Sequence, residues 1–477
     1  MSYVEGKERR QAILFPDHLD DYVSEENPVR FVDAFVEAQD FVELGFSRAE
    51  PKEMGRPSYH PGLLLRLYIY GYLYGVRSSR KLEREARRNI ELMWLMEMLT
   101  PDYRTIADFR KDNLEAIKKT CQEFTRVCKK MDMFGGVLVG VDGSKFKADN
   151  SSERNYTKKK LEKLIERADQ RIEKYLAELD KADREEEEVA ETKPVSAEEL
   201  KKRIEQLRKG REKHKQQQKN LDESGETQVS ETDPDSRLMK TREGTAVCYN
   251  VQVAVDNKYK LIAAHEVTNA GSDRGQLANI AKQSKEMMGV ENLEATTDMG
   301  YYDCKDVKEC EEEGITVYMQ KPPLGEMKKK GMFSKEDFSY KAEKDVYVCP
   351  AGEELSNRGT GIERGRQMKY YTTAACGCCE MKRQCTEGAQ RRIKRLVDEE
   401  VMERMASRVR AGPDKLRIRR ALVEHPFGTI KRAMGQGYFL MRGKSKVGTE
   451  MSMTIMAYNM KRAINIMGVK KMIEALG

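Results

Sequence analysis

The chain has 477 residues, of which 39% are hydrophobic and 35% charged, and a length of about three times 150 residues predicts two or three domains. No stretch approaches the roughly 18 consecutive apolar residues of a membrane span, and the first residues lack the apolar segment of a secretory signal, so we expect an unexported cytoplasmic protein with no membrane partner. The 87 Lys and Arg residues exceed the 80 Asp and Glu residues by only 7, which is too little to establish a polyanionic partner.

Residues 1–134 predict a helical region with a candidate DNA-binding surface. Apolar residues at helical spacing run from Pro61 to Trp94 and are interrupted by a tight turn at 75–79. The helix after this turn is basic, as in a helix-turn-helix that sets cations against DNA phosphates. Its candidate DNA contacts are Arg80, Lys81, Arg84, Arg87 and Arg88. A small helical bundle with solvated arginines would give the same pattern, so this segment alone leaves both interpretations open.

A mixed sheet flanked by helices is predicted for residues 135–155 and 236–320, which places the chain in the mixed α/β class. Short apolar runs indicate strands, and longer amphipathic runs indicate helices. The expected order is a strand at 137–143, a strand hairpin at 246–256 and 259–268, a helix at 273–288, a strand at 293–297, a helix at 303–314 and a strand at 315–320.

The segment between these two parts, residues 156–235, predicts a helical hairpin inserted into the sheet. Its apolar residues alternate four and three apart, which is a heptad seam: Leu161, Ile165, Ala168, Ile172, Tyr175 and Leu179, then Leu200, Ile204 and Leu207. Two paired helices that serve as a scaffold are the simplest account. A dimer contact and a contact with flanking DNA are the alternatives.

Residues 321–392 form a second insert, rich in Lys, Gly and Cys. Cys376 and Cys379 have the C-x2-C spacing that lets two thiolates bind one tetrahedral ion, and Cys349 with Cys385 could complete four ligands of a structural zinc site. The adjacent Cys378 leaves the register of the motif ambiguous. An iron–sulfur cluster uses similar spacings, and reduced thiols in a loop are the third interpretation.

Three acidic residues are candidates for a catalytic metal site. Asp142 and Asp298 each lie at the end of a predicted strand, and Glu424 lies on a basic helix in the last part of the chain, residues 393–477. Carboxylates that converge from different elements can hold two Mg²⁺ ions about 4 Å apart, and such ions promote in-line displacement at a phosphodiester. A single Asp at the end of a strand is more often a turn or cap residue, so spacing alone does not decide the matter.

The residues around Glu424 favour a phosphate-binding surface. Arg420 lies four residues before this acid and Lys431 seven residues after it, and these spacings correspond to one and two helical turns. All three would share one helix face if the helix continued through Pro426, although a proline there should bend or restart the helix. Arg417, Arg420, Lys431 and Arg432 are the candidate DNA contacts of this helix.

Several sequence motifs together resemble one protein family. They are Gly-Arg-Pro-Ser-Tyr-His-Pro at 55–61, Thr-Ile-Ala-Asp-Phe-Arg at 105–110, Val-Asp-Gly-Ser-Lys at 141–145, Tyr-Asn-Val-Gln-Val-Ala-Val-Asp at 249–256, Thr-Asp-Met-Gly-Tyr-Tyr-Asp at 297–303 and Glu-His-Pro-Phe-Gly-Thr-Ile-Lys at 424–431. In this order they resemble the DDE transposases of bacterial insertion sequences, and among these the branch numbered eleven-eighty-two. The resemblance covers nearly the full chain.

The resemblance implies a ribonuclease H-like catalytic domain in which two Asp and one Glu bind Mg²⁺. Residue by residue, it assigns Asp142, Asp298 and Glu424 to this triad. Arg420 and Lys431 match the family signature Tyr-x2-Arg-x3-Glu-x6-Lys, but Arg417 stands where the signature has Tyr. Whatever the Tyr contributes in other members is therefore in doubt for this chain.

The activity implied by the resemblance is DNA transposition. Hydrolysis would free the 3′-hydroxyl at each terminal inverted repeat of double-stranded DNA, and this hydroxyl would then attack the target DNA. The implied cofactors are two Mg²⁺ ions, which Mn²⁺ could replace, and the implied working form is a homodimer on paired ends, associated with the bacterial nucleoid. A domesticated DNA-binding protein that does not cut, and a ribonuclease H-like nuclease that does not join strands, are the alternatives.

Overall fold

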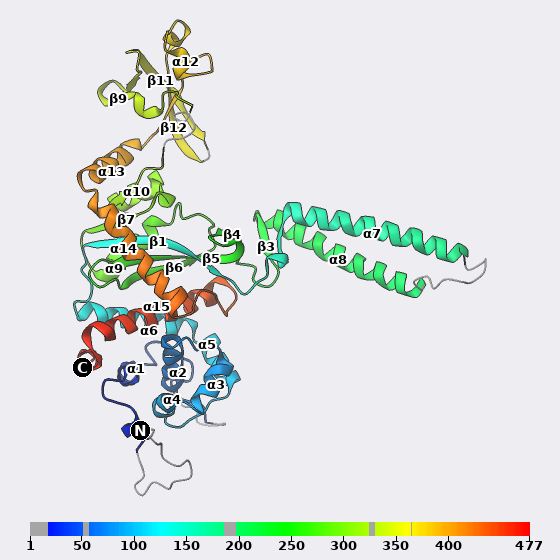
Figure 1. The fold of residues 1–477 in the computed structure, drawn as a ribbon, viewed down its shortest axis with the longest axis vertical. Coiled ribbons are helices and arrows are strands. Elements are labelled where there is room, and N and C mark those ends of the chain that lie inside the picture. Colours follow the sequence, from blue (N-terminus) through cyan, green and yellow to red (C-terminus); the bar gives the residue numbers. More distant parts are fainter. Residues whose placement is uncertain (1–17, 51–56, 186–196, 324–329, 364) are drawn as a thin grey trace, which may run out of the picture.

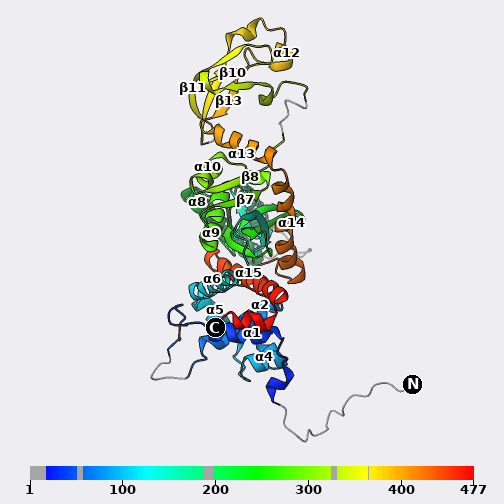
Figure 2. The same ribbon diagram turned by 90° about the vertical axis from the view of Figure 1, so that its left-hand side faces the viewer.

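The structure, a computed structural model, describes residues 18–50, 57–185, 197–323, 330–363 and 365–477. Three parts are stacked along the long axis of the molecule, and a pair of long helices projects from the middle part to one side, as Figure 1 shows. Figure 2 gives the same stacking from a second direction, with a β-rich module at one end, the main sheet in the middle and a helical head at the other end. No helix in the described part of the chain combines the length and apolar character needed to cross a membrane.

The middle part is a six-stranded mixed sheet. Its strands are β1 (Leu138–Lys147), β4 (Arg237–Thr241), β5 (Gly244–Asp256), β6 (Ile262–Thr268), β7 (Leu293–Thr297) and β8 (Ile315–Met319). β5 pairs antiparallel with β1 on one edge and with β4 and β6 on the other, whereas β7 pairs parallel with both β1 and β8. Four antiparallel strands, β1, β4, β5 and β6, are thus followed by the parallel β7 and β8, which confirms the predicted mixed sheet. Without the short β4, the order is the three antiparallel and two parallel strands of the ribonuclease H-like fold that the resemblance implies.

Helices cover this sheet. They are α9 (Leu277–Met288), α10 (Cys304–Glu312), α13 (Glu399–Ala411), α14 (Asp414–Gly428) and α15 (Lys444–Met467). α9 and α10 lie close to the helices predicted at 273–288 and 303–314, and α14 is the predicted basic helix with Glu424, whereas α15 was not predicted. α14 packs against β1, and it comes so close that a Cβ atom at Gly140 would lie 3.0 Å from the Val423 side chain. A glycine in β1 therefore lets this helix lie directly on the strand.

The head is helical, as predicted. It consists of α1 (Pro28–Glu37), α2 (Pro61–Leu73), α3 (Ser79–Ala86), α4 (Ile90–Leu95), α5 (Tyr103–Asp112) and α6 (Leu114–Lys130), after the short 3₁₀ turn η1 (Leu19–Tyr22). Every residue of α2 is buried, so this helix forms the centre of the head. α15 packs against α2 and α6 on one side and against β6 on the other, and α16 (Val469–Glu474) packs against α1. Head and sheet consequently share one continuous hydrophobic core.

The first insert forms the predicted helical hairpin. α7 (Lys158–Glu185) and α8 (Ala197–Ser224) pack against each other along their length and project away from the sheet (Figure 1). The residues that connect them, 186–196, lie outside the described part of the chain. Leu161, Ile172 and Ile204 of the predicted seam are buried. A two-stranded ribbon of β2 (Asn155–Thr157) and β3 (Gln228–Ser230) anchors the hairpin at its base.

The second insert contains a second sheet, which its sequence did not predict. Five antiparallel strands follow the order β13-β12-β11-β10-β9, with a short helix α12 (Lys382–Cys385) between the last two strands of the chain segment. The strands are β9 (Ser339–Lys341), β10 (Val346–Val348), β11 (Glu354–Glu363), β12 (Arg366–Thr372) and β13 (Ile393–Leu396). Most of these strands are too short to show an alternating pattern above the background of Lys and Gly.

A buried ion pair connects the head to the rest of the molecule. Arg77, in the turn before α3, donates to Glu450 of α15 at 3.1 Å, and the two side chains are 4% and 0% exposed. Arg77 also donates to the Tyr438 carbonyl, and Glu450 accepts from the backbone N–H groups of Leu440 and Met441. Three segments that are far apart in the sequence therefore meet at one carboxylate.

Replacing Glu450 with Ala should lower the free energy of unfolding by about 3–5 kcal/mol, because the change leaves the Arg77 guanidinium buried and without its counter-ion. Urea unfolding followed by circular dichroism would measure the change. The matched control is Glu123→Ala, which removes one partner of the exposed pair Glu123–Arg126 and should cost less than about 1 kcal/mol. Equal effects of the two changes would contradict a special role for the buried pair.

Candidate active site

The two aspartates predicted for the metal site lie on neighbouring parallel strands. The register of β1 and β7 pairs Leu138 with Glu294 and Gly140 with Thr296. Asp142 and Asp298 each lie two residues beyond this last pair, so the two acids stand at the same level of the sheet, where β7 ends. The negative charge of Asp298 raises the pKa of Asp142, in agreement with this proximity.

Each aspartate uses one carboxylate oxygen to hold the backbone that follows it. The Gly143 N–H donates to Asp142 Oδ1 at 2.9 Å, and the Gly300 N–H donates to Asp298 Oδ1 at 2.8 Å. Within the described part of the chain, neither Oδ2 atom has a hydrogen-bond donor. These local bonds fix both carboxylates and leave one oxygen of each available to a ligand.

The pKa of Asp142 is raised from 3.8 to about 6. Burial is the largest cause, because it disfavours the charged carboxylate, and repulsion from Asp298 is the second. The fully buried Tyr301 has its pKa raised well above 10 by burial and by the negative charges of Asp273, Asp142 and Asp298. The site is thus a pocket of negative charge in which a bound cation would be favourable.

Asp273 is a third acid in this pocket, and the sequence interpretation did not include it. Its Oδ1 atom accepts from the side chains of Asn250 at 2.7 Å, Gln252 at 2.9 Å and Lys145 at 3.1 Å. Its charge also acts on Asp142. The sequence placed Asp273 at the start of a helix, but α9 begins only at Leu277.

A signal for Asp273 is present in β5. Asn250 and Gln252 alternate within an otherwise apolar strand and are fully buried. Buried amides require hydrogen-bond partners, so two of them on one face of a buried strand indicate a polar group packed against that face. The sequence does not reveal which residue supplies that group.

Glu424, the third predicted ligand, does not join the two aspartates in this structure. Its side chain is 59% exposed, and Arg420 donates to it at 2.9 Å from one turn earlier in α14. This hydrogen bond lowers the pKa of Glu424. Among the described residues, no group of three or more His, Cys, Asp or Glu side chains is arranged so that it could hold a metal ion.

Arg419 lies between the aspartates and Glu424. Its positive charge lowers the pKa of Asp142 and also that of Glu424. Val423, four residues after Arg419, packs on Gly140 of β1, which places Arg419 on the side of α14 that faces the strand. Glu424 directly follows Val423 in α14, so its side chain projects from an adjacent side of the helix, at the margin of the same site.

The expected restart of the helix at Pro426 does not occur. α14 continues past Pro426 to Gly428 and passes directly into a π-helical turn, η7 (Thr429–Ala433), in which the Met434 N–H donates to the Thr429 carbonyl at 2.9 Å. A π turn contains more residues than an α turn, so it accommodates the irregularity near a proline without ending the helix.

The π turn also changes the direction of Lys431. Its ammonium group donates to Ser144 Oγ at 2.6 Å and to the Lys145 carbonyl at 2.7 Å, and it lies 4.4 Å from the centre of the Phe146 ring. Burial lowers its pKa to about 8. Lys431 therefore packs on β1, whereas Arg420 and Glu424 face solvent, and the predicted shared face is wrong for Lys431. Ser144 and Asp142 are two residues apart in β1, so their side chains lie on the same face of the sheet. Lys431, which donates to Ser144, therefore remains next to the acids.

The other predicted DNA contacts are exposed. Arg417 is 83% exposed and pairs weakly with Asp414, and Arg432 is also exposed. On α3 and just after it, Arg84, Arg87 and Arg88 are each about 60% exposed and pair with Glu83 or Glu85 nearby, while Arg80 lies 5.1 Å from the centre of the Tyr103 ring and Lys81 faces solvent. Exposed pairs of this kind are weak, so phosphates could replace the glutamates as partners.

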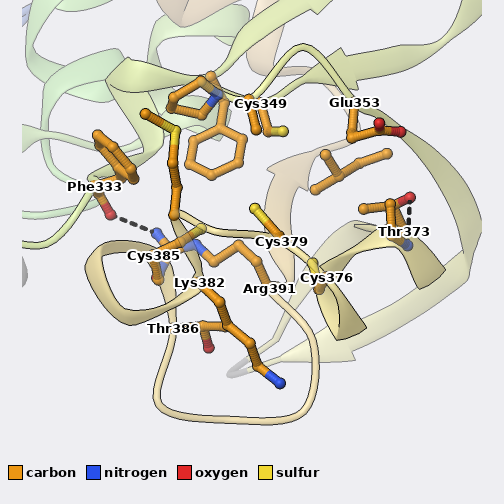
Figure 3. A pocket seen from close by; sticks show the side chains of 16 residues that line it. Phe333, Cys349, Glu353, Thr373, Cys376, Cys379, Lys382, Cys385, Thr386 and Arg391 are labelled. Carbon is orange, nitrogen blue, oxygen red and sulfur yellow. Dashed lines mark hydrogen bonds between the residues drawn. The ribbon is translucent and has the colours of Figure 1, made fainter.

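The four predicted zinc ligands line one small cavity in the β-rich module (Figure 3). Burial raises the pKa of the Cys385 thiol, Arg391 lowers it, and the neighbouring Cys376, Cys349 and Cys379 raise it further. Four of the remaining cysteines, Cys121, Cys128, Cys248 and Cys310, are buried, and all of these except Cys248 belong to the main core.

Comparisons with known proteins identify two parts of the chain. Residues 17–112 match a family model described as a transposase domain (DUF772), and residues 348–464 match one described as a transposase DDE domain. The second match includes α14 with Glu424 and the π turn with Lys431. No curated protein and no solved structure matches the chain.

Changing Asp298 to Asn should lower the pKa of Asp142 from about 6, because the neighbouring negative charge is lost, but burial should keep it above 3.8. Carbon NMR of protein labelled at the aspartate carboxyl group would follow this titration, with Asp142→Asn assigning the signal. Asp180→Asn, at an exposed site on the projecting hairpin, is the matched control and should leave the titration unchanged. An unchanged pKa in Asp298→Asn would show that the two acids do not interact.

The same shift predicts the sign of a pH effect on stability. The folded protein holds a proton on Asp142 up to about pH 6, whereas the unfolded chain loses it near 3.8. Lowering the pH from 6 towards 4 therefore favours the folded state at this residue, and Asp298→Asn should reduce that gain.

Proposed function

We propose that this chain, which belongs to the DDE transposases of insertion sequences, binds terminal inverted repeats and cuts and rejoins DNA at them with Mg²⁺ in the cytoplasm. The observation that carries the proposal is the placement of Asp142 and Asp298 side by side, two residues beyond the parallel pairing of β1 and β7, each with one free oxygen. The assignment to the branch numbered eleven-eighty-two remains a prediction.

The residues at the site fit divalent cations. Mg²⁺ prefers carboxylate oxygens and keeps several water ligands, so a pair of aspartates with one carboxylate from another element is a sufficient protein contribution. Asp142 and Asp298 would supply the fixed part of the site. When bound, the two ions would stabilise negative charge on the attacking and leaving oxygens of a phosphodiester, and Mn²⁺ could replace Mg²⁺.

Glu424 would complete the site after a change of partner. In the structure its carboxylate is held by Arg420, at an exposed position where this bond contributes little. A DNA phosphate is a stronger competitor for the Arg420 guanidinium, because charged hydrogen bonds to phosphate can be bidentate. We therefore expect DNA binding to release Glu424 towards Asp142, so that the third acid is recruited only when substrate is present.

Three cations around the acids would position the phosphodiester. Arg419 acts on Asp142, Lys145 holds Asp273, and Lys431 is fixed against Ser144. They attach to different elements, so together they could orient one phosphate against the carboxylates. Water would then attack the phosphate at each end of the element and free a 3′-hydroxyl there. That hydroxyl would attack a phosphodiester of the target DNA and displace the 3′-oxygen of the target strand.

Two ends must be joined in one event, so the proposed working form is a dimer on paired ends. The proposed contacts with the terminal repeats are the exposed arginines on α3 and just after it, Arg84, Arg87 and Arg88. This surface belongs to the segment that matches the first transposase model.

Asp142→Asn, Asp298→Asn and Glu424→Gln should each reduce Mg²⁺-dependent cleavage by at least about a hundredfold, because each removes a carboxylate ligand of the ions that stabilise the transition state, while end binding stays unchanged. The assay would incubate the full chain with its own flanking genomic DNA and Mg²⁺, map the nicks and detect joined products. Glu123→Gln is the control.

The outcomes of this assay distinguish the proposed transposase activity from the alternative functions. Cleavage that persists in the three variants would show that the acids are chosen wrongly. Cleavage without joined products would identify a nuclease, and binding without cleavage in the wild-type chain would identify a DNA-binding protein that has lost its activity.

Replacing Arg84 and Arg87 together with Ala should weaken end binding and flatten its salt dependence by about 0.9 in log K against log salt for each phosphate that the protein no longer neutralises. The matched control is Arg203→Ala with Lys209→Ala on α8, since these cations are also exposed and paired with glutamates one turn away. A flatter slope in the control alone would move the DNA-binding face to the projecting hairpin.

A further inference from the structure

The β-rich module holds a cluster of thiols that the proposed DNA chemistry does not use. Cys349, Cys376, Cys379 and Cys385 line the same cavity, and they come from three separate turns of the chain (Figure 3). Cys349 follows β10, Cys376 and Cys379 lie in and after the 3₁₀ turn η6 (Ala374–Gly377), and Cys385 ends α12.

The backbone holds these cysteines in tight turns. The Gly352 N–H donates to the Cys349 carbonyl and the Cys349 N–H donates to the Glu353 carbonyl, both at 2.9 Å, which closes a knuckle between β10 and β11. On the opposite side, the Lys382 N–H donates to the Cys379 carbonyl at 3.1 Å. Arg391 donates to the carbonyls of Cys385 and Phe333, at 3.1 and 3.0 Å, and so fixes the end of α12.

The structure separates Cys378 from the other four. Its thiol is exposed and lies 3.7 Å from the Ala375 carbonyl, and Cys378 does not line the cavity. The pair that faces the cavity is therefore Cys376 with Cys379, which has two residues between its members. This is the spacing at which two thiolates can bind one ion.

The module has little else to stabilise it. Its hydrophobic core consists of five buried residues, Phe338, Tyr347, Leu355, Tyr371 and Ile393, and the partly buried Cys349 and Cys385 pack against this core. Units with so few core residues usually need disulfides or a metal ion to fold. All ten cysteines are free thiols here, so a disulfide does not fill this need.

Four thiols line the cavity, which is the number of ligands that a tetrahedral ion takes. Zinc is the ion whose usual structural site consists of four thiolates in a tetrahedron.

We propose that Cys349, Cys376, Cys379 and Cys385 bind one structural zinc ion that closes this cavity. In the structure the four sulfurs line the cavity but are not yet arranged around one point. On binding zinc they would turn inward to a common centre, each at about 2.3 Å from the ion, and lose their protons. Since all four positions are taken by protein, the ion has no open site for a substrate, and its role is to hold the three turns together.

Metal analysis of the purified full chain tests this proposal without relying on DNA cleavage. Inductively coupled plasma mass spectrometry should find one zinc per chain in the wild type, and Cys378→Ser should retain it. Cys379→Ser and Cys385→Ser should lose it, because three thiolates hold zinc much more weakly than four. Retention of zinc in both of these variants, loss of zinc in Cys378→Ser, absence of metal from the wild type, or iron with sulfide in its place would overturn the proposal.

Thiol labelling of the wild-type chain gives a second test that needs no variant to fold. An alkylating reagent followed by peptide mass spectrometry should modify Cys378 at once and leave the four ligands protected. A zinc chelator should expose all four together, with a large rise in their labelling, while Cys121 and Cys128 in the main core stay protected. Rapid labelling of the four cysteines before chelation would contradict zinc binding.

Discussion

The parallel register of β1 and β7 is the constraint on which the active site depends. Asp142 and Asp298 are far apart in the sequence, and only the pairing of Gly140 with Thr296 brings them to the same level of the sheet. A shift of one residue in this register would turn one acid to the other face. The hydrogen bonds of the ladder hold the two like charges together, and burial together with repulsion from Asp298 raises the pKa of Asp142.

The rest of the catalytic pocket is organised around this pair. Gly140 allows α14 to lie on β1, and this contact sets Arg419 beside the acids and Glu424 at their margin. The π turn after Pro426 directs Lys431 to the strand. The carboxylates of Asp142 and Asp298 are therefore fixed in the sheet, whereas Glu424 and its partner Arg420 lie on the exposed surface of α14. In the proposed function, this division makes the recruitment of Glu424 depend on DNA binding.

Long insertions do not disturb this arrangement because they leave the sheet at the ends of its strands. The hairpin of α7 and α8 interrupts the chain between β1 and β5, and the β-rich module interrupts it between β8 and α14, yet each has its own small core. α15 then returns through the centre of the molecule, and its Glu450 closes the ion pair with Arg77 of the head. The head and the catalytic sheet are thereby fixed relative to each other.

The sequence by itself determined the order of most strands and helices around the main sheet, the paired helices of the first insert, and the candidate aspartates Asp142 and Asp298, because local periodicity is set by neighbouring residues. It did not predict β4 or α15. The spacing of the cysteines also limited the candidate zinc ligands to Cys349, Cys376, Cys379 and Cys385, with the register left open by Cys378. Only the tertiary structure identified Asp273, separated Cys378 from the cavity, turned Lys431 towards β1 and left Glu424 with Arg420. Each of these depends on contacts between residues far apart in the chain, or on a single irregular helical turn, and neither leaves a periodic pattern in the sequence.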